Sequence, residues 1–430
     1  MPRRTTVARK ILTLPSDDVF KEFEDGSSTQ SVSTTMGFTR LLRNLARDKD
    51  FGERVVPIIP DEARTFGMDS LFRELKIYAS QGQKYEPVDH DMLLNYAEAT
   101  DGQILEEGIT EAGAMSSWIA AATSYATRGV PMVPFYTFYS MFGFQRVGDL
   151  IWQAADARAR GFLLGATAGR TTLMGEGLQH QDGHSLLLAT AIPACQAYDP
   201  AFAFEVAAIV QHGITKMYGE DPADIFYYIT LYNENIQMPP QPSHVSTQDI
   251  INGLYQWAPA GSGTAQASIL FSGSAFTAAS EAATILRSKY SIDVDLWSAT
   301  SYKSLRDDAM EVERWNRLHP TEKKRRSHVD TMLGATTAPV VAVTDFLRIV
   351  SEQVATFVPS RRFLSLGTDG MGRSDTREAL REYFETNAPH IVIAVLFSLI
   401  GSHGVTKEIV AQAIIDLNIN PDAVHSLTRD

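Results

Sequence analysis

Short apolar runs alternate with longer segments of helical spacing along the first half of the chain. Residues 34–49 carry apolar side chains at helical intervals, and the continuous apolar run at 55–59 follows them as a buried strand. The alternation then repeats three times, as helix 111–127 and strand 130–136, helix 142–160 and strand 161–165, and helix 201–218 and strand 225–229. Strands that alternate with helices of this length predict a doubly wound, mostly parallel α/β sheet.

A proline-rich segment at residues 235–246 separates this pattern from a second, smaller α/β pattern. The second pattern has one long helix at residues 275–289. Its four apolar runs are at residues 267–271, 292–298, 339–343 and 363–367. The longest apolar run, residues 391–400, is too short to span a bilayer and predicts a buried strand or helix. We therefore expect an N-terminal arm at 1–33, a first domain at 34–240 and a second at 241–430.

Charge and cysteine usage narrow the class of partner and the compartment. Acidic residues outnumber basic ones by 51 to 38, for a net charge of −13, and phosphate binding needs a basic surface. We therefore expect no nucleic-acid partner. The single cysteine, Cys195, excludes an intramolecular disulfide and fits a reducing compartment. The basic first residues are followed by no apolar signal segment, so we expect a cytoplasmic protein without a membrane partner.

The stretch DGQILEEGITEAGAM at residues 101–115 places a carboxylate at the start of a helix. The apolar residues 103–105 predict a short strand, Gly108 ends it, and Thr110 is the predicted N-cap of a helix that begins at Glu111. A carboxylate in a first helical turn is stabilised by the helix dipole, so this stretch alone does not require a catalytic role.

Residues 135–146, FYTFYSMFGFQR, are unusually aromatic, with six aromatic side chains among the first ten. One interpretation is a strand end and helix start that pack in a core, where aromatic rings bury much area. The other is a slot for a flat heterocycle at a strand-to-helix turn. The residues alone leave both open.

A glycine-rich stretch at residues 175–184, GEGLQHQDGH, contains two histidines and two carboxylates. Gly183 argues against a helix that would present His180 and His184 as paired metal ligands. A flexible loop that brings both imidazoles to a substrate is one interpretation, because imidazole relays protons near neutral pH. A surface loop whose histidines meet water is the other.

Four consecutive basic residues at positions 323–326 form a cluster flanked by Glu322 and Ser327 on a predicted loop. A solvated surface explains the cluster, and a phosphate site is the alternative.

Taken in order, these stretches resemble one family: the carboxyl-terminal half of the homodimeric-type pyruvate dehydrogenase decarboxylating component, a transketolase-like thiamine diphosphate enzyme. The motifs are GITEA at 108–112, FYSMFGFQR at 138–146 and GRTTLMGEGLQH at 169–180. Further matches run along the chain, at residues 58–68 (IIPDEARTFGM), 228–235 (YITLYNEN), 313–316 (ERWN) and 366–375 (LGTDGMGRSD). The resemblance implies a pyrimidine-binding domain followed by a transketolase-like C-terminal domain.

The resemblance also implies roles for individual residues. Glu111 matches the glutamate that bonds N1′ of the cofactor's aminopyrimidine, and protonation of that nitrogen activates the 4′-amino group as a base. Burial among apolar neighbours would raise its pKa enough for it to donate a proton. Phe142, with Tyr139 beside it, is expected to stack on the pyrimidine. His180 matches a histidine that faces the substrate, and Glu62 a carboxylate of the same pocket.

One family motif is missing. The family holds the cofactor diphosphate through Mg²⁺ with a Gly-Asp-Gly motif, and no Gly-Asp-Gly occurs in these 430 residues. The resemblance therefore implies a separate α-like subunit that carries the Mg²⁺ ligands. The chain starts with Met, so we favour the β-like subunit of a naturally split enzyme and expect a hetero-oligomer. A tetramer with two copies of each chain is what the resemblance implies. An excised fragment is the alternative.

Three departures from the family pattern fall near the predicted substrate loop, which includes His180, Gln181 and His184. Met174 stands where relatives carry Asn, Gln181 where they carry Glu, and Leu186 where they carry a third His. Lost polar groups can change which donor is accepted.

The first hypothesis is a subunit that decarboxylates pyruvate or another 2-oxo acid and passes the acyl group to a lipoyl-bearing acyltransferase. The second is two-carbon glycolyl transfer from a ketose phosphate to a lipoyl or carrier-protein acceptor. The third is a structural subunit without chemistry, against which the joint presence of Glu111, Phe142 and His180 argues.

Overall fold

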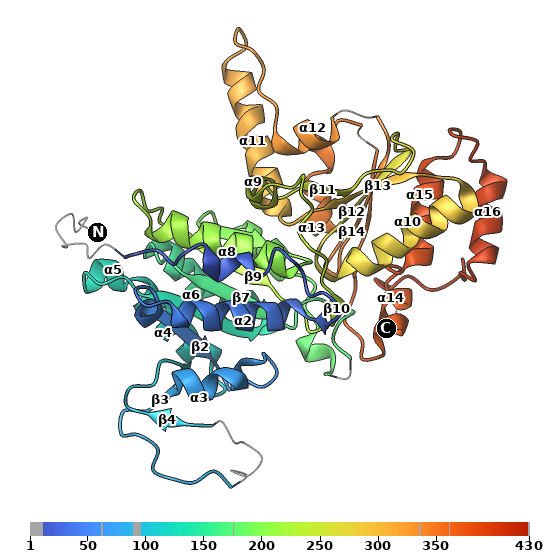
Figure 1. Cartoon of the computed structure of the whole chain (residues 1–430). Helices are drawn as coiled ribbons and strands as arrows, with labels where there is room; N and C mark the ends of the chain where they lie inside the picture. The colour runs from blue at the N-terminus through green and yellow to red at the C-terminus, as the bar shows by residue number, and fades with distance from the viewer. Residues whose placement is uncertain are drawn as a thin grey trace. The chain divides into compact units, whose positions relative to one another are not determined.

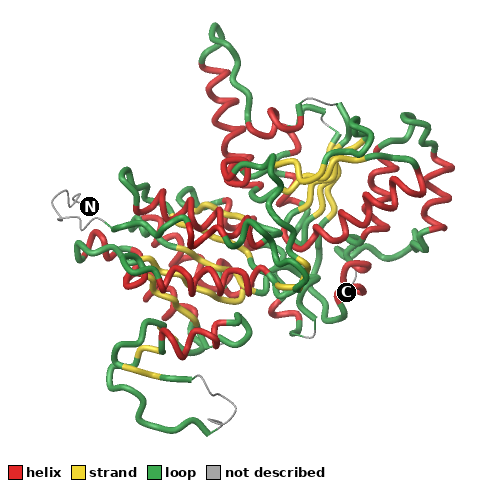
Figure 2. The backbone as a smooth tube through the Cα atoms, in the orientation of Figure 1, coloured by secondary structure: helices red, strands yellow, loops and turns green. Residues whose placement is uncertain are grey.

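The computed structural model of the chain describes residues 12–61, 63–88, 96–174, 176–334, 337–360 and 362–428. They form two compact units. Unit 1 contains the described residues of 1–168, 188–196 and 202–241, and unit 2 contains those of 169–187, 197–201 and 242–430. Each unit has its own sheet flanked by helices (Figure 2).

Unit 1 is built on a six-stranded sheet of order β5-β2-β6-β7-β9-β8. The strands are β2 (Val55–Ile59), β5 (Leu105–Glu106), β6 (Val133–Tyr139), β7 (Phe162–Ala166), β8 (Cys195–Tyr198) and β9 (Phe226–Thr230). The pairs of β2 with β5 and β6, and of β7 with β6 and β9, are parallel. Strands β2, β7 and β9 are buried along their whole length, as expected of parallel strands covered on both faces. The predicted doubly wound sheet is thus confirmed.

Helices cover both faces of this sheet because crossover connections are right-handed. The connections β5–α4–β6 and β6–α6–β7 run one way along the sheet, whereas β8–α8–β9 runs the other way. Accordingly α4 packs against α6, and α2 packs against α8 (Figure 1). The helices of unit 1 include α1 (Asp18–Lys21), α2 (Thr34–Arg47), α3 (Phe72–Leu75), α4 (Glu111–Ala122), α5 (Ser124–Thr127), α6 (Phe144–Asp156) and α8 (Ala203–Tyr218).

Two boundaries differ from the sequence prediction for local reasons. The predicted helix 111–127 is interrupted at Thr123, whose hydroxyl donates to the Ile119 carbonyl, a back-bond that bends helices. Strand β6 begins at Val133 rather than at 130, because the Met132 N–H donates to the Ser124 hydroxyl instead of to a neighbouring strand.

The described part of the N-terminal arm packs on unit 1. Phe20 and Phe23 are buried, and β1 (Ser31–Val32) pairs with β10 (Ile236–Gln237). The Ser33 hydroxyl accepts from the Met36 N–H and so caps α2. A second small pair, β3 (Ile77–Tyr78) with β4 (Glu98–Ala99), was not predicted.

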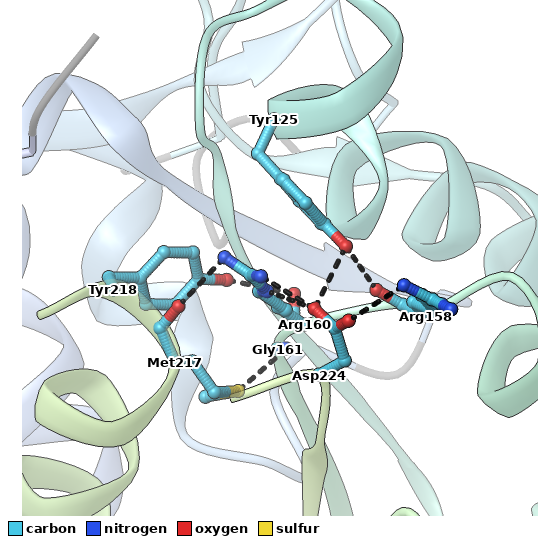
Figure 3. A network of polar contacts seen from close by, with 7 residues as sticks. All are labelled: Tyr125, Arg158, Arg160, Gly161, Met217, Tyr218 and Asp224. Atoms are coloured by element: carbon cyan, nitrogen blue, oxygen red, sulfur yellow. Dashed lines mark hydrogen bonds and ion pairs between the residues drawn. The ribbon is translucent and has the colours of Figure 1, made fainter. Parts of the chain in front are cut away.

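An ion pair between a buried arginine and a partly exposed aspartate joins the amino-terminal ends of two central strands (Figure 3). Arg160, just before β7, donates through Nη2 at 2.5 Å to Oδ1 of Asp224, just before β9. The Arg160 guanidinium also lies 3.9 Å from the ring centre of Tyr125, and Nη1 donates to the Met217 carbonyl. This edge of the sheet is therefore held together by its own side chains, whereas the loops at the opposite, carboxyl edge carry the candidate site.

Unit 2 is built on a five-stranded sheet of order β11-β13-β12-β14-β15. The strands are β11 (Tyr255–Ala258), β12 (Ala267–Phe271), β13 (Val294–Ser298), β14 (Val340–Val343) and β15 (Phe363–Leu366). Only β11 is antiparallel to its neighbour among these pairs, and it lies at the edge. The four predicted runs form the four parallel strands.

The helices of unit 2 include α9 (Thr247–Asn252), α10 (Phe276–Tyr290), α11 (Tyr302–Leu318), α12 (His328–Leu333), α13 (Ile349–Glu352), α14 (Arg377–Tyr383), α15 (Ala388–Ser398) and α16 (Lys407–Asp416), and α7 (Ser185–Thr190) begins in this unit. All but the last two residues of the apolar run at 391–400 lie in α15, a helix that the Asn387 side chain caps by accepting from the His390 N–H. Within the described residues, no helix is long and apolar enough to cross a membrane.

Candidate functional site

The loops that follow β2, β5 and β6 meet at the carboxyl edge of the unit 1 sheet, where parallel sheets place their ligands. The Gly108 N–H donates to the Pro60 carbonyl at 2.7 Å, so the loops after β5 and β2 touch. Gly108 has a φ of +80°, which lets the chain turn from β5 into α4. Thr110 caps α4 as predicted, with its hydroxyl 3.2 Å from the Gly113 N–H.

Glu111 is the first residue of α4, and its carboxylate has a partner that the sequence interpretation did not assign. Nη1 of Arg146, in the first turn of α6, donates to Oε1 of Glu111 at 2.9 Å. The Glu111 side chain is only 12% exposed, whereas the Arg146 side chain is 50% exposed. The same guanidinium lies 4.0 Å from the ring centre of Phe142. Arg146 thus connects the candidate carboxylate to the candidate stacking ring.

The aromatic stretch divides into a buried part and a half-buried part. Phe135 is fully buried and stacks on Phe162 with ring centres 4.7 Å apart, so this part of the stretch packs in the core. Tyr139 and Phe142 are half-buried and meet edge to face at 5.9 Å, and Tyr139 also contacts Phe66 of the loop after β2. The core interpretation is therefore confirmed for Phe135, whereas the slot for a flat heterocycle stays a prediction for the half-buried Tyr139 and Phe142.

A further carboxyl group at this edge was not singled out from the sequence. Glu106 ends β5, and burial, reinforced by the nearby carboxylates of Asp61 and Glu98, raises its pKa to about 7. Strongly shifted carboxyl groups gather at functional sites, so Glu106 joins the candidate list. The predicted pocket residue Glu62 lies outside the described residues.

The predicted substrate loop belongs to unit 2 and is bonded to its core. The buried carboxylate of Asp345, next to β14, accepts from the Thr171 N–H at 2.9 Å and from the Ser274 hydroxyl at 3.1 Å. Burial raises the pKa of Asp345 to about 6. The Arg170 guanidinium is also buried, which lowers its pKa, and it donates to the carbonyls of Thr368 and Gly370. The first residues of the loop are therefore fixed.

His180 is half-buried and ends a short 3₁₀ turn, Leu178–His180, whose other two residues are exposed. Its Nδ1 lies 2.7 Å from the Glu176 carbonyl oxygen. A carbonyl oxygen only accepts, so Nδ1 carries the proton, and a neutral His180 ring then has its lone pair on Nε2.

The neighbours of His180 serve the structure of the loop. Gln181 is buried; its Oε1 accepts from the Arg373 N–H at 2.6 Å, and its Nε2 donates to the Leu173 carbonyl at 3.4 Å. Asp182 accepts from the His184 N–H and so turns the chain into α7. No helix runs through Gly183, as predicted.

The three departures from the family pattern have different surroundings. Gln181 and Leu186 are buried, whereas Met174 is 52% exposed. Among the predicted site residues, Glu111, Tyr139 and Phe142 lie together in unit 1, and His180, Gln181 and His184 lie together in unit 2. Among the described residues, no group of three His, Cys, Asp or Glu side chains is placed to hold a metal ion.

Comparisons with known proteins agree with the resemblance seen in the sequence. The family model for the pyruvate dehydrogenase E1 component middle domain matches residues 12–239, and the transketolase-like C-terminal domain matches residues 253–387. The chain is 50% identical over 410 residues to the pyruvate dehydrogenase E1 component of Pseudomonas aeruginosa, covering 95% of this chain and 46% of that protein. It is 52% identical to that of Mycobacterium tuberculosis, covering 93% and 43%. The chain spans about half the length of these curated relatives.

Solved structures with a similar fold are transketolases. The Campylobacter jejuni enzyme aligns with a TM-score of 0.63 at 16% identity, over 88% of this chain and 49% of that chain. A protein described as a split gene transketolase, inactive beta4 tetramer, aligns with a TM-score of 0.54 at 18% identity, over 86% of this chain and 98% of that chain. At these identities the likeness establishes the fold alone.

Proposed function

Because the chain belongs to the pyruvate dehydrogenase E1 component family, we propose that it is one subunit of a thiamine diphosphate-dependent 2-oxo acid dehydrogenase. The proposed reaction decarboxylates pyruvate or a related 2-oxo acid and transfers the acyl group to a lipoyl group. The observation that carries this proposal is the arrangement of Glu111, Arg146 and Phe142 at the carboxyl edge of the unit 1 sheet.

The side chains at this edge suit the pyrimidine ring of thiamine diphosphate. Tyr139 and Phe142 are half-buried rings that contact each other. Arg146 contacts both the Phe142 ring and the largely buried Glu111 carboxylate, and so links the two. Aromatic faces and one positioned carboxylate are what a flat ring with a basic nitrogen requires. When bound, the cofactor supplies the electron sink for cleavage of the bond next to the donor's carbonyl group.

The chain's own groups then hold the ring and move protons. Arg146 donates to Oε1 of Glu111, and Oε2 has no hydrogen-bond partner among the described residues, so Oε2 is the oxygen proposed to exchange a proton with the pyrimidine. His180, with its proton on Nδ1, is proposed to accept a proton from the substrate at Nε2. Glu62 is proposed as a second carboxylate of the same pocket.

We assign the diphosphate-binding domain and its Mg²⁺ ligands to a partner chain. The chain spans about half of its relatives, and no Gly-Asp-Gly occurs in its 430 residues. The split gene transketolase, almost all of whose chain aligns here, is by its description inactive as a tetramer of that chain. We expect this chain alone to be inactive and a complex with two copies of each chain to be active.

The alternative donor is a ketose phosphate, with transfer of a glycolyl unit to a lipoyl or carrier-protein acceptor. The departure at Met174 motivates it, because a thioether stands where the resemblance implies an amide and a lost polar group can change which donor is accepted. Gln181 and Leu186 are buried, so Met174 is the departure whose side chain is open to solvent.

The two functions separate in one experiment. The chain is co-purified with its candidate partner, Mg²⁺ and thiamine diphosphate, and reduction of an artificial electron acceptor is followed with pyruvate or with xylulose 5-phosphate. Turnover of pyruvate supports the dehydrogenase function. Turnover of the sugar phosphate alone would replace it with glycolyl transfer. Turnover of neither would contradict glycolyl transfer from this sugar and pyruvate as the donor, and would leave only another 2-oxo acid.

A further inference from the structure

The far end of α11 in unit 2 carries a concentrated positive charge on an otherwise acidic chain. We call residues 314–326 the α11 tip. They contain six lysine or arginine residues and one acidic residue, Glu322, whereas the whole chain has a net charge of −13. Every residue from 317 to 326 is exposed, and in Figure 1 this end of the helix extends away from the sheet of its unit. Neither the cofactor nor the donor chemistry proposed above uses these residues.

The α11 tip is shaped by contacts among its own residues. Trp315 stacks on His319 with ring centres 4.5 Å apart, and the Arg325 guanidinium lies 3.9 Å from the Trp315 ring centre. The Asn316 side chain donates to the Arg325 carbonyl at 3.0 Å and accepts from the Arg325 N–H at 2.8 Å. These bonds close the loop onto the last turns of α11. Most side chains of the tip are exposed, so these contacts add little to the core of unit 2. They instead hold the basic side chains of the tip close together.

Some of the basic side chains of the tip have a partner within the tip or next to it, and others have none. Arg325 is stacked on Trp315, and Arg326 donates through Nε to Asp330 at 2.6 Å. Lys323 and Lys324 are exposed and have no ion-pair or hydrogen-bond partner among the described residues. Bidentate clamping of a phosphate uses arginine forks, whereas lysines act as mobile point charges. Arg317 also pairs with Glu313 at 3.9 Å. With three of its four arginines engaged, the tip is suited to steering a charged partner rather than to clamping a small phosphate.

We propose that the α11 tip is the docking point for an acidic protein domain, the carrier that brings the acyl acceptor. The proposal rests on the proposed function, which requires such an acceptor. Most of this chain's surface repels an acidic domain, and at physiological salt charges act only over about 8 Å, so a local patch decides where the domain approaches. A carrier must arrive and leave in every turnover, which favours electrostatic steering over a large apolar interface.

Nucleic acid fits the α11 tip less well. A nucleic-acid site needs a basic surface that follows several phosphates, and a chain with a net charge of −13 repels the rest of such a polymer.

The test is charge reversal in the co-purified complex. Lys323→Glu with Lys324→Glu is compared with Lys289→Glu with Lys407→Glu, which changes the net charge equally at exposed positions of α10 and α16 in the same unit. A lipoylated domain of net negative charge is the acceptor. We expect the tip variant to raise KM for this domain about tenfold at low salt, an effect that 0.5 M salt removes. The control variant should change KM little, and turnover with an artificial electron acceptor should be unchanged in both.

Equal KM values for the tip and control variants would overturn the proposal. If charge reversal prevents assembly, Lys323→Gln with Lys324→Gln and direct titration of the lipoylated domain onto the complex provide the same comparison. Binding that depends on the tip, without any acyl transfer, would support the docking point and contradict the proposed function. Normal acyl transfer that is unchanged in the tip variant would support the proposed function and contradict the docking point. The proposal would also be overturned if the tip variant lost binding to a DNA oligonucleotide but still bound the carrier.

Discussion

Glu111 shows how much of a site a sequence can indicate at the scale of one residue. Its place at the start of a helix followed from Thr110 and Gly108, and its proposed role followed from the family resemblance. Its partner Arg146 could not be assigned, because the two are 35 positions apart. Their contact depends on the strand order β5-β2-β6, which brings the loops after β5 and β6 close together. Glu106 was missed because its shifted pKa arises from burial and neighbours, not from a motif.

Gln181 gives a prediction about loop structure. Gln181→Glu replaces the amide that donates to the Leu173 carbonyl with a carboxylate oxygen, so two acceptors face each other in a buried place. We expect a loss of about 1–3 kcal/mol in the free energy of unfolding at pH 8. A protonated carboxyl donates again, so the loss should shrink at pH 5. Chemical denaturation at both pH values measures it, with exposed Gln179→Glu as the control. Equal stability of the two variants at pH 8 would contradict this role of Gln181.

Glu106 gives a prediction about pH. Its pKa is raised from 4.5 to about 7, so the folded protein holds this proton more tightly than the unfolded chain does. Its contribution to stability is therefore present below pH 4.5 and is lost as the pH rises through 7. Glu106→Gln should remove that part of the pH dependence and raise the melting temperature relative to the wild type at pH 8, measured by thermal unfolding from pH 5 to 8. Parallel curves for the two proteins would show that Glu106 titrates normally.

At the scale of elements, burial decides which strands the sequence reveals. Strands β2, β7, β9 and β12 are continuous apolar runs buried on both faces, and their predicted positions agree with the structure to within about one residue. Strands β8 and β11 lie at sheet edges and mix polar with apolar residues, so no run marks them. Helix α11 was missed because most of its surface is polar and its apolar stripe is narrow.

The loop after β7 gives a prediction at this scale. Gly169 has a φ of +83°, and a Cβ there would lie 2.1 Å from Oδ2 of buried Asp345. Gly169→Ala should therefore lower the free energy of unfolding by about 2–4 kcal/mol, since backbone strain and a clash add. Gly263→Ala is the matched control, because its φ of +78° is similar but its Cβ would meet nothing within 4 Å. It should cost only about 1–2 kcal/mol. Equal losses in denaturant titrations would show that Asp345 does not hold the loop.

At the scale of the whole molecule, the proposed function needs a diphosphate-binding domain that this chain is not proposed to supply. Composition and pattern predicted two α/β units, and the two sheets agree with that prediction. The chain spans about half the length of its relatives and contains no Gly-Asp-Gly, and the partner chain proposed above is not identified by any property of the fold. On the proposed division between two chains, the chemistry at Glu111 is measured in the assembled complex.

The most direct test of the central claim is donor turnover by that complex with Glu111→Gln, measured with an artificial electron acceptor. Glu107→Gln, in the same loop but bonded to Ser117, is the control. If Glu111 exchanges a proton with the cofactor, its variant should assemble normally and lose activity about 10²–10⁴-fold, while the control stays within a few fold of wild type. An assembled Glu111→Gln complex with wild-type turnover would contradict the account.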